Sequence, residues 1–145
     1  MNRGEQALAV ARAWIGTPYV HQASTQFAGC DCLGLLRGVW RSLYGAEPED
    51  MPAYSADWSE ASGNERLWAA AIRHLEPVEG PEAPGDVLLF RMRRDAVAKH
   101  VAILAEHGSV PTIIHAYSRR GVVETALTEA WQRRVVAAFE FPLKG

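Results

Sequence analysis

Along the first half of the chain, apolar residues recur every three or four positions, which is the period of an amphipathic helix. This pattern predicts helices over residues 5–15, 32–43 and 64–75. Gly34 and Gly38 lie four residues apart in the second of these segments. Glycine inside a helix is less favourable than alanine by about 1 kcal/mol, so we expect both to lie where this helix approaches a sheet closely.

The second half of the chain has shorter apolar runs that are rich in β-branched residues, as strands are. Turns with glycine or proline separate these runs. Three helices followed by an antiparallel meander predict an α+β fold, with the N-terminal helices packed on an antiparallel sheet of about five strands. The expected strands are 87–92, 100–105, 112–116, 122–126 and 135–141.

The length of 145 residues predicts a single domain over residues 1–145. A hydrophobic content of 48% and a charged content of 22% are those of an ordinary folded protein. The formal net charge of -2 argues against nucleic acid as the main partner, because phosphate binding requires a basic surface. We see no signal-peptide pattern and no apolar run of the ~18 residues that a membrane span needs, so we expect synthesis in the cytoplasm.

Residues 29–34, with the sequence GCDCLG, carry the most informative chemistry of the chain. Cys32 lies at the expected start of the second helix, where oriented N–H groups stabilise a thiolate, and Asp31 is placed to cap that helix. His100 and His115 follow in expected strands. Cysteine, histidine and a further polar residue form the chain order of papain-like hydrolases. His100 would accept the thiol proton, and His115 would orient the His100 ring.

Other interpretations of these residues are structural. Cys32 could be a small buried apolar residue, and each histidine alone could be a hydrogen-bonded core residue. For Cys30 we favour packing over a redox or regulatory role. A zinc site at the cysteine pair is disfavoured, because Cys-x-Cys lacks the Cys-x₂-Cys spacing of such sites. We therefore expect no metal ion and no organic cofactor.

Four segments together resemble the NlpC/P60 family of papain-like cell-wall peptidases, and they occur in the family's order over essentially the whole chain. These motifs are most similar to those of the compact peptidases encoded with phage tails and gene transfer agents. Those peptidases also have the pattern IHAYS, here at residues 114–118. The four segments are GTPY at 16–19, GCDCLGL at 29–35, PGDVLLF at 84–90 and HVAI at 100–103.

The resemblance implies hydrolysis of an amide bond in peptidoglycan stem peptides, typically next to D-glutamate or diaminopimelate. Cys32 matches the family's nucleophile, His100 its general base and His115 its third polar residue. Tyr19 matches a tyrosine that lines the site and helps to hold the substrate or the oxyanion, and Asp31 precedes the nucleophile as it does in the family.

Two departures from the family's pattern concern the substrate preference. Leu33 occupies a position where the family often has serine, and residues 21–23, with the sequence HQA, replace a common glycine pair.

Our leading hypothesis is therefore a peptidoglycan endopeptidase carried in a phage-like tail, where it would contact hub or baseplate proteins and open the periplasmic or cell-wall peptidoglycan during DNA delivery. One alternative is a structural tail module that keeps the fold but serves for docking. Another is an amidase of the N-acetylmuramoyl-L-alanine type.

Overall fold

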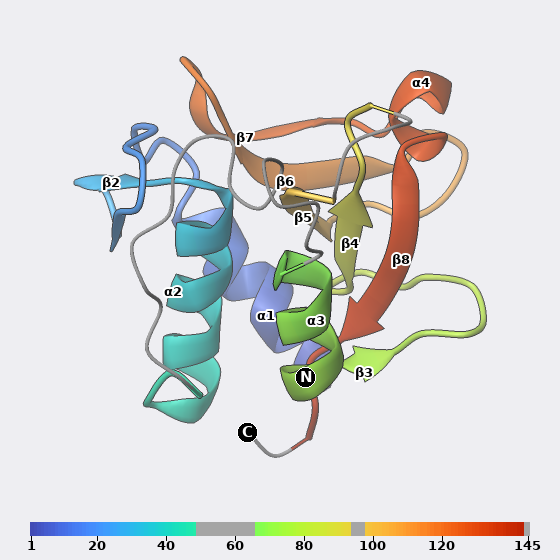
Figure 1. Ribbon diagram of the computed structural model, residues 1–145, viewed down its shortest axis with the longest axis horizontal. Coiled ribbons are helices and arrows are strands. Elements are labelled where there is room, and N and C mark those ends of the chain that lie inside the picture. The colour runs from blue at the N-terminus through green and yellow to red at the C-terminus, as the bar shows by residue number, and fades with distance from the viewer. Residues whose placement is uncertain (49–65, 94–97, 144–145) are drawn as a thin grey trace.

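The computed structural model describes residues 1–48, 66–93 and 98–143. The longer helices lie in the N-terminal half of the chain and the longer strands in the C-terminal half, as expected for an α+β fold (Figure 1). In chain order they are α1 (Arg3–Ala13), β1 (Ser24–Thr25), β2 (Gly29–Cys30), α2 (Cys32–Tyr44), α3 (Arg66–His74), β3 (Glu76–Pro77), β4 (Val87–Phe90), β5 (His100–Leu104), β6 (Thr112–Tyr117), β7 (Gly121–Ala126), α4 (Glu129–Gln132) and β8 (Val135–Glu140).

The main sheet is antiparallel throughout, with the strand order β3-β8-β4-β5-β6-β7. Figure 1 shows α1, α2 and α3 grouped together and α4 apart from them, beyond β8. The helix-side core joins α1 and α2 to alternate residues of the strands, such as Val87, Leu89 and Ile103. The intervening residues, such as Leu88 and Leu104, form a second core on the other face. The expected α+β architecture is confirmed.

The structure adds elements that the hydrophobic pattern did not predict. Strand β3 makes the sheet six-stranded instead of five-stranded, and its two residues are exposed, so they leave no apolar signature. Helix α4 has only four residues, which is too short for a helical period to be recognised. The meander is also incomplete: β4 to β7 are consecutive neighbours, but β8 returns after α4 to pair with β4.

The helix boundaries differ from the expected ones mainly at the first helix. Helix α1 begins earlier than expected because Asn2 caps it, and the Asn2 and Glu5 side chains form a reciprocal capping box. Helix α2 matches its expected range closely, from Cys32 to Tyr44. The expected start of the third helix, at residues 64 and 65, lies outside the described residues.

The two helix glycines have the expected packing role, but what they face is the end of α1 and the segment leading into the small β1–β2 sheet, not the main sheet. A Cβ atom on Gly38 would lie 2.2 Å from the Trp14 ring, which packs on α2 from the end of α1. A Cβ atom on Gly34 would lie 1.9 Å from the carbonyl oxygen of Ala23. The missing side chains therefore let α2 approach α1 and the β1 strand segment closely.

We expect the substitution Gly38→Ala to destabilise the fold by about 1–3 kcal/mol, because the added methyl group overlaps the buried Trp14 ring and outweighs the gain in helix propensity. Gly80→Ala is the matched control, since a Cβ atom there meets nothing within 4 Å. Urea unfolding measures both. Equal stability of the two variants would contradict the close approach of α1 and α2.

Candidate active site

Asp31 holds the start of α2 in place. The residue is 3% exposed, and its Oδ1 atom accepts a hydrogen bond of 2.8 Å from the Gly34 N–H, as an N-cap does. The Oδ2 atom accepts a second bond of 2.7 Å from the Gln22 N–H. One carboxylate thus joins the helix start to the loop after Tyr19, and Cys32 follows it as the first residue of the helix.

The Cys32 thiol lies against the beginning of β5. Its Sγ atom is 3.8 Å from the Lys99 carbonyl oxygen, and a hydrogen bond from the Val101 backbone also reaches the sulfur. These two backbone groups flank His100 in the chain. The structure therefore brings the expected nucleophile and the backbone of the expected base together, although 67 residues separate Cys32 from Lys99.

The two expected histidines are joined directly. The His100 Nε2 atom lies 2.9 Å from the His115 Nδ1 atom, and the His115 Nε2 atom lies 2.9 Å from the Thr125 hydroxyl oxygen. The hydrogen-bonded series therefore crosses β5, β6 and β7. His115 is 1% exposed, so both of its ring nitrogens are occupied inside the protein. Its orientation is fixed by these two bonds.

Thr125 is a site residue that sequence reasoning missed. It lies two positions beyond Val123, the residue paired with His115 across the β6–β7 hairpin, and it is therefore a diagonal neighbour on the same face. The available signal was a hydroxyl residue in a run expected to be apolar. Only the strand register distinguishes such a residue from an exposed threonine.

Trp131 is the second residue that the sequence analysis did not single out. Its indole lies 5.7 Å from the His100 ring and 5.4 Å from the His115 ring, measured between centroids. The Phe90 and Tyr117 rings lie 5.4 and 6.0 Å from the same indole. Aromatic side chains therefore surround the imidazole pair.

The charge state of the site differs from the expectation. Burial raises the pKa of the Cys32 thiol to about 11, and the hydrogen bonds from the Val101, Leu33 and Cys32 backbones lower it by less. Burial lowers the pKa of His100 to about 3, assisted by the charge of His115, and lowers the pKa of His115 to about 4. Burial therefore opposes the thiolate that the helix start favours, and of the two effects on the Cys32 pKa desolvation is the larger.

Tyr19 lies beside the two cysteines. It forms an isolated bridge with Cys30, and burial together with the Cys32, Asp31 and Cys30 charges raises the pKa of its phenol to about 12. Cys30 itself has no exposed surface, and burial raises the pKa of its thiol to about 12. A neutral, fully buried thiol is what a packing residue requires.

The described part of the chain contains no group of three histidine, cysteine, aspartate or glutamate side chains that could hold a metal ion. Among the helices that the structure describes, none has the length and apolar character needed to cross a membrane.

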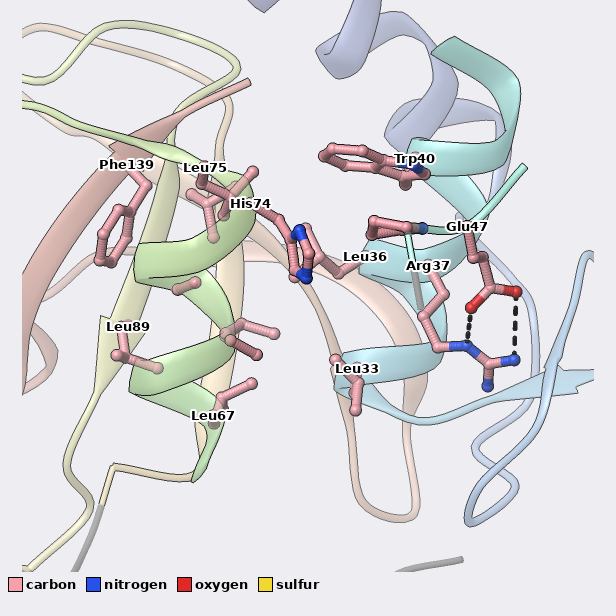
Figure 2. Close-up of a pocket in the computed structure, with 15 residues that line it drawn as sticks. Leu33, Leu36, Arg37, Trp40, Glu47, Leu67, His74, Leu75, Leu89 and Phe139 are labelled. Carbon is pink, nitrogen blue, oxygen red and sulfur yellow. Dashed lines mark hydrogen bonds and ion pairs between the residues drawn. The ribbon is translucent and has the colours of Figure 1, made fainter. Parts of the chain in front are cut away.

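An apolar pocket between α2 and α3 lies next to this site (Figure 2). Its volume is about 80 Å³, and Leu33 and Val101, the neighbours of Cys32 and His100 in the chain, contribute to its wall. Trp40 and His74 also line it, with ring centroids 6.3 Å apart. Cys32 is not among its lining residues, so the pocket is separate from the sulfur.

Comparisons with solved structures identify the class of fold. No protein-family model matches the sequence, and no curated protein matches it. An NlpC/P60 family protein from Bacillus cereus ATCC 10987 has a TM-score of 0.67 and 20% identity, covering 97% of this chain and 40% of its own. The NlpC/P60 domain of the peptidoglycan hydrolase SagA has a TM-score of 0.64 and 23% identity, covering 97% and 100%. NlpC2 from Trichomonas vaginalis has a TM-score of 0.65 and 20% identity, covering 97% and 46%.

These likenesses show that the chain has the papain-like NlpC/P60 fold, with helices packed on an antiparallel sheet. The chain spans 40% of the length of the Bacillus protein and the whole length of the SagA domain.

We expect Asp31→Ala to lower the free energy of unfolding by about 1–3 kcal/mol, because two backbone N–H groups at a buried site lose their acceptor. Asn2→Ala is the matched control, since Asn2 is an exposed N-cap and its loss costs about 1 kcal/mol. Urea unfolding at pH 7 compares them. An Asp31→Ala variant as stable as the wild type, beside an Asn2→Ala variant that shows its expected loss, would show that the carboxylate does not hold the helix start.

The lowered histidine pKa values also predict that acid weakens the fold. Between about pH 6.5 and 4 the unfolded chain binds protons that half-buried His100 and buried His115 do not, so stability is full above pH 6.5 and decreases as the pH falls. The expected slope is up to about 1.4 kcal/mol per pH unit for each imidazole. Urea unfolding at several pH values measures it.

His100→Gln should reduce this slope, and His107→Gln, at an exposed position, should leave it unchanged. A slope that is the same in all three proteins would contradict the buried neutral pair.

Proposed function

We propose that this chain is a cysteine hydrolase of the NlpC/P60 family that cleaves amide bonds in peptidoglycan stem peptides. The observation that carries the proposal is that Cys32, at the start of α2, meets the backbone at the start of β5, where His100 begins the hydrogen-bonded series to His115 and Thr125. The SagA domain comes from a peptidoglycan hydrolase, and the whole of that domain aligns with this chain. This likeness supports the choice of substrate.

In the proposed reaction His100 takes the proton of the Cys32 thiol as the sulfur attacks the amide carbonyl carbon. The resting thiol and imidazole are both neutral, so the proton moves during the attack and no ion pair is needed beforehand. The N–H groups in the first turn of α2, including that of Cys32, would bind the oxyanion. Two of these groups already lie close to the sulfur, because hydrogen bonds from the Cys32 and Leu33 backbones lower the pKa of the thiol.

The second half of the reaction returns the proton and frees the enzyme. His100 gives its proton to the departing amine, and the acyl group remains on Cys32 as a thioester. Water then attacks this thioester, and the thiol is released. His115 and Thr125 hold the His100 ring through both steps, and Tyr19 is proposed to contact the substrate or the oxyanion from its position beside the cysteines.

We also propose, from the resemblance of the sequence motifs, that the protein is carried in a phage-like tail. Its expected partners are tail hub or baseplate proteins. A docking module without activity would need none of the hydrogen bonds that join His100, His115 and Thr125, which favours the enzyme.

We expect Cys32→Ala to lower the rate of peptidoglycan cleavage by at least about a thousandfold, because the nucleophile is removed while a small residue still fills its place. Cys30→Ala is the matched control: it deletes a neighbouring buried thiol that takes no part in the proposed chemistry. The measurement is digestion of purified sacculi, with products identified by mass spectrometry.

New fragments from the wild type and Cys30→Ala alone would identify the bond and separate an endopeptidase from an amidase. Wild-type activity in Cys32→Ala would show that the nucleophile is assigned wrongly. A folded wild type that cleaves no sacculi would favour the docking module.

A further inference from the structure

Trp131 is held over the histidine pair by its own short helix. The Thr128 hydroxyl caps α4 by accepting from the Trp131 N–H, at 3.4 Å, and the Trp131 carbonyl accepts from the Arg134 N–H, at 2.9 Å. The Gln132 side chain donates to the Leu127 carbonyl oxygen, at 3.0 Å, which ties the helix back to the end of β7. The backbone that carries the indole is therefore held on both sides of Trp131.

The ring geometry places the indole against both imidazoles at once. It stands nearly perpendicular to the His115 ring, with an interplanar angle of 89°, and is tilted by 42° to the His100 ring. The Phe90 ring meets the same indole at 86° and also lies 5.7 Å from His100. Edge-to-face and tilted contacts at these distances are the favourable arrangements of aromatic rings.

Resting on the proposed function, we propose that Trp131 is a positioning residue: it covers the hydrogen bond between His100 and His115, excludes water from it and fixes both rings. Trp131 would touch neither the sulfur nor the reacting carbonyl in this role. It would act through the histidines, as the hydrogen bond to Thr125 also does.

The surroundings of the pair explain why exclusion of water matters. Strand β4 contributes Phe90 and α4 contributes Trp131, and neither carries a charge. Among the described residues, the titratable Tyr117 of β6 lies against the His115 ring, and the charge that shifts the pKa of His100 is that of its partner His115. The Cys32 thiol of α2 meets the backbone beside His100, at the Lys99 carbonyl oxygen. Desolvation therefore dominates, and the indole is a large part of what replaces water around the rings.

The first experiment is an NMR titration of the histidine ring signals in the full chain. We expect Trp131→Ala to raise the pKa of His100 and His115 by at least about one unit, because water enters. Trp131→Phe, which keeps an aromatic ring, should retain most of the lowering, and Trp131→Leu should give an intermediate rise. Trp68→Ala is the control: Trp68 is also partly buried, but it packs in the helix-side core, and its loss should leave both values unchanged.

Unchanged histidine pKa values in a folded Trp131→Ala or Trp131→Leu variant would overturn the proposal, and so would an equal rise in the Trp68→Ala control. If Trp131→Ala does not fold, the comparison of Trp131→Leu with Trp131→Phe decides. This readout needs no substrate, so it stands even if the wild type proves unable to cleave sacculi. If the wild type cleaves, we expect kcat to fall at least tenfold in Trp131→Ala, with KM little changed and kcat largely restored in Trp131→Phe.

Discussion

The close approach of α2 to its surroundings is the constraint on which the site depends. Two glycines let the helix contact Trp14 and the Ala23 backbone, and the buried Asp31 carboxylate fixes its first turn. With the helix start held in this way, the Cys32 sulfur meets the Lys99 and Val101 backbone groups. A shift of a side chain's width at the helix start would separate the thiol from β5, so packing far from the sulfur determines where the sulfur lies.

Burial sets the chemistry of the site as much as its geometry does. The same desolvation acts in opposite directions on a thiol and on an imidazole, because it disfavours the charged form of each. In this site it outweighs the helix N-terminus, and both groups rest uncharged. A helix start alone is therefore insufficient to predict a thiolate. The depth at which the sulfur lies has to be known as well.

The sequence was sufficient for the fold class, for helix α2 and for the five longer strands, because α2 has a clear helical period and the strands are apolar, β-branched runs between turn residues. It did not predict β3, whose residues are exposed, or α4, whose four residues make little more than one helical turn. For the site, the structure joins His100 to His115 and brings Cys32 to the same strand, while their catalytic roles stay predictions. Thr125 was not predicted because only the strand register places it beside His115. Trp131 was not predicted because only the ring contacts made from a short helix place it against the histidines.

The hairpins that carry the imidazole series have a consequence for folding. His100, His115 and Thr125 lie within consecutive antiparallel strands, so the segments that bring them together are near one another in the chain. Cys32 joins them across a much longer separation. Because short loops close at a lower entropic cost than long ones, the proton-carrying part of the site can assemble on its own hairpins. On this ground we expect α2 to dock after the hairpins form, so that an incompletely folded chain holds the imidazole pair without the sulfur beside it.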